Sequence, residues 1–425
     1  MSIEFIIFLA MIGTFLICAF GFKLPASISM MISSIVGALV GREGIALRHL
    51  VEGTFSYVDT ILVIACAMIF MKVIEKSGAL DAISALIIEK FHKKPALLLI
   101  LVMLVIMFPG MITGSSTASV LSAGSIMAPV LLMMGIPGVE AAAILAMGGI
   151  LGMIAPPVNI PAMIIGGGID IPYVGFEVPL LVLTIPIAIF SVLYFGYKYV
   201  KGLDYEAIKG KLNFEVGEKF GFRIYIPIIL AVILMVLNKL VPAIPDLGMP
   251  LVFIISSIVG LFTGYKINIL EEVKSAINDA LPVMGILMGV GMFIQVMTLT
   301  GVRGFIVTAC ISLPNSLRYV AMAISIPLFG AVSSFGAASV LGVPFLLSFM
   351  AKNQIITAAA ISLIAGAGDM VPPTALAGIF AAKVLNLESY VPVMKKCIVP
   401  VALMIIWSII LIIFSPQLAP FIVFK

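Results

Sequence analysis

The sequence contains very little charge. Only 10% of its 425 residues are Asp, Glu, Lys or Arg, whereas 62% are hydrophobic and the mean hydropathy is +1.28. A water-soluble protein of this length cannot bury so large an apolar fraction in its core, which excludes a soluble fold. Uncharged segments such as residues 398–414 instead match the roughly 20 residues that cross a bilayer core of about 30 Å. The sequence therefore predicts an all-α polytopic membrane protein.

Residues that carry catalytic or metal chemistry are scarce too. The two histidines lie in polar flanks, and the four cysteines follow no CxxC or metal-ligand spacing: Cys18, Cys66, Cys310 and Cys397. There is no GxSxG motif, and no Gly-rich phosphate loop ending in Lys-Ser/Thr, so ATP is not expected to drive the protein. We therefore expect no enzymatic activity, no cofactor other than a coupling ion, and no nucleic-acid partner.

Apolar segments of membrane-spanning length recur along the chain. Two of them, near 139–170 and 355–386, contain Pro-Pro pairs and are predicted to be broken helices. Regions near 95–135 and 317–351 carry a small polar cluster at mid-length. They are predicted to be re-entrant hairpins, because non-helical backbone is tolerated at membrane depth only inside protein or a wet cavity. Unbroken spans are predicted near 3–21, 24–40, 58–76, 177–199, 223–243, 248–264, 278–298 and 391–414.

The two halves of the chain resemble each other. Residues 71–80 (MKVIEKSGAL) match 294–303 (IQVMTLTGVR), and residues 116–120 (STASV) match 336–340 (GAASV). The two Pro-Pro segments match as well, with one gap. An internal repeat of this kind predicts two structurally related halves.

The repeat sets the domain boundaries. Residues 1–200 and 223–425 form the two repeats, and the polar stretch 201–222 is expected to be a cytoplasmic linker. With both hairpins re-entrant, most of the 24 Lys and Arg residues fall on one side, which the positive-inside rule assigns to the cytoplasm. The first hairpin then enters from the cytoplasm and the second from outside, with Arg303 and Arg318 in outer loops. Inverted repeats of this kind are typical of transporters.

The Pro-Pro pairs, Pro156–Pro157 and Pro372–Pro373, explain the broken helices, because proline removes a backbone donor and clashes with the preceding turn. Each break frees the carbonyls of one half-helix, which can coordinate a cation. It also frees the amides of the next half-helix, which favour an anion. Together with the hydroxyls of the hairpin tips, the breaks predict a midplane site for Na⁺ and a carboxylate. Gly152, just before the first break, is assigned to the ion site.

Asp369 is the candidate charge deep in a break. An intramembrane carboxylate is costly and so points to function, although a partly wet residue paired with a backbone amide is an equal alternative. The hydroxyl clusters at 113–119 and 333–339 also have two interpretations, since small hydroxyl residues pack membrane helices closely. Two clusters at matching positions, each followed by a Pro-Pro break, favour a binding site.

An intramembrane aspartyl protease is a remote alternative, because residues 366–369 spell GAGD, the GxGD motif of such enzymes. That chemistry requires two carboxylates that share one site. No Tyr-Asp partner motif occurs within a predicted span, and Asp59 lies near the outer end of one. The four-residue match in a glycine-rich protein carries little weight.

These segments resemble a known family, the large membrane subunit of tripartite ATP-independent periplasmic (TRAP) transporters within the ion transporter superfamily. The similarity is carried by residues 67–83 (AMIFMKVIEKSGALDAI), 114–137 (GSSTASVLSAGSIMAPVLLMMGIP), 142–167 (AAILAMGGILGMIAPPVNIPAMIIGG) and 372–378 (PPTALAG). It extends over most of the chain in order and is more specific in the first half.

The resemblance implies an elevator-type fold, with scaffold helices at the start of each half and a moving transport domain of hairpins and broken helices. It further implies Na⁺-driven uptake of an organic carboxylate, such as a dicarboxylate or sugar acid, across a bacterial or archaeal inner membrane. A periplasmic solute-binding protein and a separate small membrane subunit would be partners. The implied substrate positions are Ser116, Thr117, Asn159, Ser339 and Thr374. The implied ion positions, with Na⁺ at the two hairpin tips, are Ser115, Ser119, Ser333 and Ser334.

Two features depart from the family pattern. The second break has GDMVPP, where a neutral residue and a threonine are expected before the prolines, so Asp369 leaves room for proton coupling. The second tip, SSFGAAS, has fewer hydroxyls than the first. No fused small subunit is seen, so that partner is expected to be separate or absent. A stand-alone sodium- or proton-coupled carboxylate carrier of the same superfamily is therefore the alternative.

Overall fold

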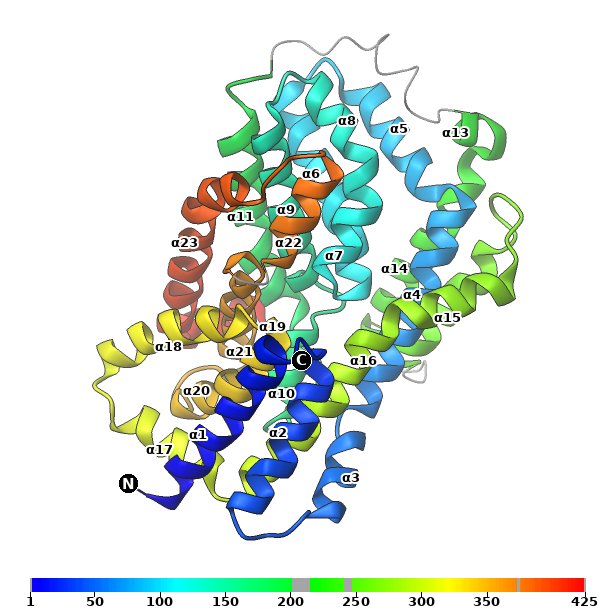
Figure 1. Cartoon of the computed structure of the whole chain (residues 1–425). Coiled ribbons are helices and arrows are strands. Elements are labelled where there is room, and N and C mark those ends of the chain that lie inside the picture. The colour runs from blue at the N-terminus through cyan, green and yellow to red at the C-terminus, as the bar shows by residue number, and fades with distance from the viewer. Residues whose placement is uncertain (1, 201–214, 241–246, 373–374, 424–425) are drawn as a thin grey trace.

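The computed structural model describes residues 2–200, 215–240, 247–372 and 375–423, and all regular structure in these ranges is helical (Figure 1). The helices of the first half are α1 (Ile3–Leu16), α2 (Ala26–Val40), α3 (Leu47–Phe55), α4 (Val58–Ser77), α5 (Ala79–Phe91), α6 (Pro95–Thr113), α7 (Ser116–Ser119), α8 (Ser125–Met133), α9 (Gly138–Ile154), α10 (Ile160–Gly167) and α11 (Glu177–Gly196).

The second half repeats this order. Its helices are α13 (Glu215–Phe220), α14 (Ile226–Leu240), α15 (Gly248–Gly260), α16 (Ile269–Leu299), α17 (Val302–Ser312), α18 (Asn315–Gly330), α19 (Ser334–Ala337), α20 (Val343–Ser348), α21 (Gln354–Gly366), α22 (Leu376–Val384), α23 (Val391–Ile413) and α24 (Ser415–Ile422). Short π-helical turns follow α1, α7 and α19.

The two halves lie in the membrane with opposite orientations. Helix α5, which precedes the first hairpin, lies at one end of the molecule, whereas α17, which precedes the second hairpin, lies at the other end (Figure 1). The half-helix α10 packs beside α21, and α22 packs beside α9, so each broken helix runs antiparallel to its counterpart. The predicted fold class, an inverted repeat with two hairpins and two broken helices, is confirmed.

Most predicted spans match observed helices. Within the described ranges, seven helices are long and apolar enough to cross a membrane, or eight if α3 and α4, bent by 40° at their junction, count as one span. The prediction was wrong about the start of the span placed at 278–298, because α16 begins at Ile269. Its first turns carry Glu271 and Glu272, and these polar residues hid the helix from a search for apolar segments.

Most of the predicted linker, residues 201–214, lies outside the described residues. The residues that follow, 215–225, form α13 and a 3₁₀ turn. Val216 is fully buried against Gly78, and the Phe220 ring meets Tyr265 edge to face at 5.0 Å. These apolar contacts dock the segment onto the start of α5.

Two packed units divide the helices. The first unit is called the scaffold. In it, helix α16 packs against α2, α3 and α4, and α15 packs against α4. In the second, the transport domain, α9 is surrounded by α6, α11, α22 and α23. Close backbone approach is needed in both: a side chain at Gly53 of α3 would collide with the α16 backbone at Gly291 and Met292. The transport domain holds both hairpins and both breaks.

Candidate functional site

The two hairpin tips and the second break meet at one buried carboxylate. Asp369 lies in the 3₁₀ turn that ends the first half of the second broken helix, and only 5% of its surface is exposed. The Ser116 hydroxyl, from the tip of the first hairpin, donates a hydrogen bond of 2.5 Å to its Oδ2 atom. The Ser334 hydroxyl, from the tip of the second hairpin, lies near the same carboxylate and interacts with it. Both repeats therefore contribute to the site.

The serines that contact Asp369 hold equivalent places in the two repeats. Ser116 is the first residue of α7 and Ser334 the first residue of α19, and each follows a serine that caps its helix. The sequence match had set Ser116 against Gly336, and this register was wrong by two residues. A π-helical turn follows each short helix and preserves the corrected register.

The breaks also align, without the gap that the sequence match required. Ile160 and Leu376 begin the second half-helices, so Pro156 corresponds to Pro372 and Met153 to Asp369. The carboxylate thus occurs in one repeat only. The site has an inverted two-fold framework but a single charge.

The remaining hydroxyls of the first tip have local partners. The Ser115 oxygen caps α7 by accepting from the Ala118 amide at 3.3 Å, and it lies 3.0 Å from the Thr117 hydroxyl. The Ser119 hydroxyl donates a long bond of 3.5 Å to the Met107 carbonyl. Serine and threonine are favoured at helix starts because their oxygens accept from free backbone amides, as Ser115 does here. Ser115 and Thr117 are only half-buried, so their oxygens stay accessible at the tip.

The second tip repeats this arrangement with fewer hydroxyls. Ser333 is half-buried and caps α19, accepting from the Gly336 amide at 3.1 Å. Ser339 is buried, and its hydroxyl donates to the Gly336 carbonyl at 2.9 Å. Thr374, which the resemblance placed at the substrate site, lies outside the described residues, as does Pro373.

Asn159 organises the first break. Its Oδ1 atom caps α10 by accepting from the Ala162 amide at 2.9 Å. Its Nδ2 atom donates to the Ile154 carbonyl at 2.8 Å and to the Ser362 hydroxyl of α21 at 2.9 Å. The side chain is fully buried, so it ties the two sides of the break to each other and to the opposite repeat.

Glycine pairs let the hairpins approach the broken helices. A side chain at Gly152 would collide with the Met107 backbone of α6, and one at Gly110 would meet the Gly152 backbone at 2.9 Å. In the other repeat, a side chain at Gly330 would lie 2.9 Å from the Cα atom of Gly368. These two equivalent crossings place the hairpin elbows against the helix ends that adjoin the breaks.

The expectation that Arg303 and Arg318 are loop residues was wrong. Arg303 lies in the first turn of α17 and donates from Nη2 to the Gly168 carbonyl at 2.5 Å. Arg318 lies in α18 and donates to the carbonyls of Cys310 and Ser348, among others. Their sequence neighbours are polar enough to suggest loops. No local sequence pattern predicts that Arg303 bonds a carbonyl 135 residues away in the chain.

Comparison with known proteins identifies the family. Residues 5–418 match the family model described as "Tripartite ATP-independent periplasmic transporter, DctM component". The chain belongs to this family. It is therefore the large membrane subunit of a secondary transporter of the TRAP class, and a multi-pass membrane protein. Members of the family work with a substrate-binding protein and a small membrane subunit.

A solved structure shares the fold of this chain. The crystal structure of the YdaH transporter of Alcanivorax borkumensis superposes with a TM-score of 0.59 at 13% sequence identity, covering 86% of this chain and 87% of that one. At this identity the likeness bears on the fold alone. No curated protein matches the sequence.

Proposed function

We propose that this TRAP subunit couples the uptake of an organic carboxylate to the entry of Na⁺, with both bound in the transport domain near Asp369. The observation that carries the proposal is the meeting of three elements at that carboxylate: the two hairpin tips, through Ser116 and Ser334, and the second break. A site shared by both repeats is where inverted-repeat transporters hold substrate and ion.

The ligand atoms at this site suit sodium. They are carboxylate and hydroxyl oxygens, which are among the donors that hard cations prefer. Among the described residues there is no group of three or more His, Cys, Asp or Glu side chains that could hold a transition metal. A sodium ion beside Asp369 would offset the cost of a buried negative charge and allow an anionic substrate to approach.

The division into scaffold and transport domain supports an elevator mechanism. Both hairpins and both breaks belong to one packed unit around α9, whereas α2, α3, α4, α15 and α16 form the other. Movement of the first unit past the second, as a rigid body, would carry the site from one side of the membrane to the other. The periplasmic binding protein would deliver the carboxylate to the outward-facing site.

Two alternatives predict different chemistry at Asp369. In a proton-coupled carrier, the carboxylate itself would bind and release the coupling ion. In an aspartyl protease, a second carboxylate would share the site. The polar groups beside Asp369 in the described part of the chain are serine hydroxyls from two hairpins, which favours transport over proteolysis.

Reconstitution into proteoliposomes tests the proposal. The chain is assayed alone, and with its binding protein and small subunit, using radiolabelled dicarboxylates and sugar acids. Uptake should follow an inward Na⁺ gradient and should require the partners. Uptake that persists without Na⁺ rejects sodium coupling, and uptake by the chain alone favours the stand-alone carrier.

The Asp369→Asn variant separates the two ions. If the carboxylate serves a sodium site, the variant loses Na⁺-driven uptake at every pH. If Asp369 carries protons, uptake by the parent depends on a pH gradient and this dependence disappears in the variant. Ser122→Ala is the control, because the Ser122 hydroxyl bonds only within its own hairpin, to the Ala118 carbonyl at 2.6 Å.

A further inference from the structure

The carbonyl end of α10 is held by two residues, one at the start of α17 and one just before α4. Arg303 of α17 donates to the Gly168 carbonyl at 2.5 Å, and the Tyr57 hydroxyl, next to α4, donates to the Ile164 carbonyl at 3.2 Å. The last carbonyls of a helix lack partners within it and carry partial negative charge, so a cation and a hydroxyl donor are favourable there. α10 belongs to the transport domain and α4 to the scaffold, so the Tyr57 bond crosses the boundary between the two units. α17 packs against both α16 and α20, so Arg303 lies at that boundary.

The contact is close on both sides of the α10 end. Tyr57 is 6% exposed, and a side chain at Gly167 would lie 3.2 Å from its ring. A side chain at Gly168 would lie 2.5 Å from Val343 of the second hairpin. The end of α10 is thus clamped between the scaffold and the second hairpin.

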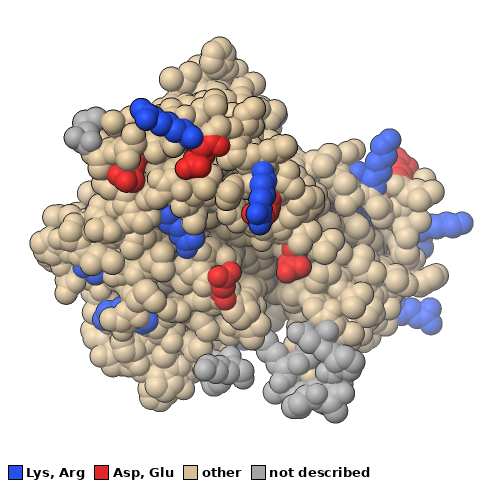
Figure 2. Space-filling model, turned by 90° about the horizontal axis from the view of Figure 1, so that it is seen from below, with Lys and Arg blue, Asp and Glu red and all other residues tan. Residues whose placement is uncertain are grey.

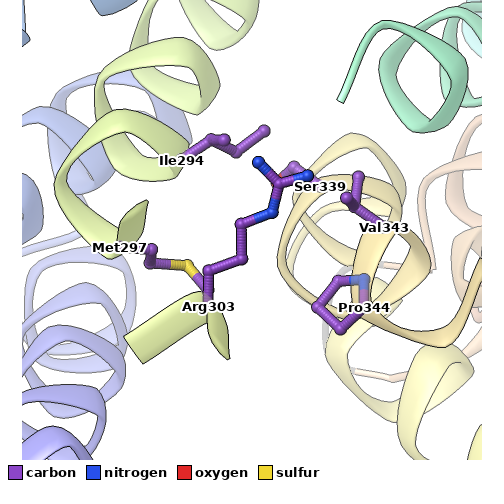
Figure 3. A pocket seen from close by; sticks show the side chains of 6 residues that line it. All are labelled: Ile294, Met297, Arg303, Ser339, Val343 and Pro344. Atoms are coloured by element: carbon purple, nitrogen blue, oxygen red, sulfur yellow. The ribbon is translucent and has the colours of Figure 1, made fainter. Parts of the chain in front are cut away.

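Arg303 also faces a narrow cleft between the scaffold and the second hairpin. Figure 3 shows its guanidinium between Ile294 of α16 and the side chains of Ser339 and Val343. Met297 of α16 and Pro344 of α20 complete the lining. At this position one arginine touches the α10 terminus and separates α16 from the second hairpin.

Closer to the middle of the molecule, the second hairpin also packs against the scaffold and α1. The tip of the second hairpin packs against α16, and a side chain at Gly336 would collide with Met30 of α2. The rings of Phe15, in α1, and Phe329, in α18, stack at 5.7 Å. Figure 2 views the α17 end of the molecule and shows charged residues of both signs scattered over a mostly uncharged surface.

The opposite end has a different arrangement. The first hairpin tip, α7, packs chiefly against α6, α9 and α22, all within the transport domain. The sequence repeat sets Leu80, a buried apolar residue, opposite Arg303, so the arginine has no cationic counterpart in the first repeat.

We propose that Arg303 and Tyr57 form a latch that closes the outer side of the transporter by binding the carbonyl end of α10. The outer side is the one opposite the lysine-rich loops. Release of the two bonds would be a step in outward opening, and the latch would favour the state in which the transport domain is closed toward the outside. The latch concerns access to the site and is independent of which ion or substrate is carried.

Labelling of a buried cysteine tests the latch. Met297 lines the cleft beside Arg303 and is 2% exposed. In a chain whose four native cysteines are replaced, Met297→Cys is reacted from outside with a membrane-impermeant maleimide, without substrate or a sodium gradient. The initial labelling rate should be low in this parent. It should rise about tenfold with Arg303→Gln, because a charge-assisted hydrogen bond is lost.

Further variants keep the test decisive. Tyr57→Phe removes one hydroxyl and should raise labelling by about threefold, while Arg303→Lys should fall between parent and Arg303→Gln. Arg48→Gln is the matched control, since Arg48 pairs with Glu52 on exposed α3 at the same end and should leave labelling unchanged. Unchanged or slower labelling in both Arg303→Gln and Tyr57→Phe would overturn the latch. If Arg303→Gln does not fold, Tyr57→Phe alone decides.

Discussion

The Ser116 hydroxyl donates a 2.5 Å hydrogen bond to the carboxylate of Asp369, which lies 253 residues further along the chain in the opposite repeat. The bond joins the tip of one hairpin to the break of the other repeat's helix. The candidate binding region is therefore a product of both halves, and neither half can form it alone. A hydrogen bond from a hydroxyl to a charged group contributes about 1.5–3 kcal/mol of stability, so removal of this hydroxyl should have a measurable effect.

Loss of either tip serine should weaken sodium binding. Ser116→Ala and Ser334→Ala each remove one hydroxyl from Asp369, and we expect each to raise the Na⁺ concentration for half-maximal uptake by about tenfold. The measurement is initial uptake against Na⁺ concentration in proteoliposomes. Ser122→Ala, in the same hairpin but away from the carboxylate, should behave like the parent. Equal sodium dependence in all variants would remove the tip serines from the ion site.

The glycine crossings should tolerate no side chain. Gly152→Ala places a methyl group against the Met107 backbone, and Gly368→Ala places one against Gly330. Overpacking of this kind costs about 1–3 kcal/mol, so both variants should unfold at a lower temperature. Unfolding in detergent can be followed with a thiol-reactive dye, because Cys18, Cys310 and Cys397 are buried.

Gly304→Ala is the control for this experiment. Nothing lies within 4 Å of a side chain placed there, on the exposed face of α17. Alanine is the better helix former by up to about 1 kcal/mol, so this variant should unfold at the same or a higher temperature. A fall equal to that of Gly152→Ala would mean that helix glycines are needed in general, and not for the crossings.

Much of the fold could be predicted from the sequence because the bilayer simplifies the problem. A span must be apolar over about 20 residues, and a Pro-Pro pair within such a segment must break the helix. Both breaks and both hairpins were therefore visible. Helices such as α3 and α17 were missed because they are short and amphipathic or polar, so neither hydropathy nor length distinguishes them from loops.

The candidate site was only partly predictable. Hydroxyl clusters and Asp369 could be selected by composition, since few polar residues lie in the apolar segments. Their pairing could not, because Ser334 and Ser116 become equivalent only through the helix caps at Ser333 and Ser115. The sequence match followed the more similar letters STASV and GAASV, and the backbone follows the caps instead. The bond from Arg303 to Gly168 is likewise set by tertiary packing.

The buried pair between Glu140 and Lys396 should stabilise the transport domain. The Lys396 ammonium lies 2.8 Å from Oε1 of Glu140, which also accepts from the Tyr199 hydroxyl at 3.2 Å. The carboxylate is 9% exposed, but the lysine is 48% exposed, so solvent screens part of the attraction. We expect Glu140→Gln to cost about 1–2 kcal/mol, measured as a lower unfolding temperature.

The surface pair between Arg48 and Glu52 provides the comparison. Its side chains are 85% and 45% exposed, so Glu52→Gln should cause no measurable change. A double-mutant cycle with Lys396→Met would isolate the coupling between Glu140 and Lys396. A coupling near zero would show that the contact between Glu140 and Lys396 does not stabilise the protein.

Asn159 should act as a brace as well as a helix cap, and one substitution separates the two roles. Aspartate caps helices as well as asparagine does, so Asn159→Asp keeps the acceptor for the Ala162 amide. It replaces the Nδ2 donor, however, with an oxygen that faces the Ile154 carbonyl, and it buries a charge. We expect Asn159→Asp to destabilise the protein more than Asn159→Ala does, and to reduce uptake.

Asn353→Asp is the control for this substitution. Asn353 caps α21 by accepting from the Ile356 amide at 3.0 Å, and it is only half-buried. A negative charge at a helix start is favourable there. If both aspartate variants were as stable as the parent, Asn159 would be a cap alone, and the link from the first break to Ser362 would contribute nothing to the site.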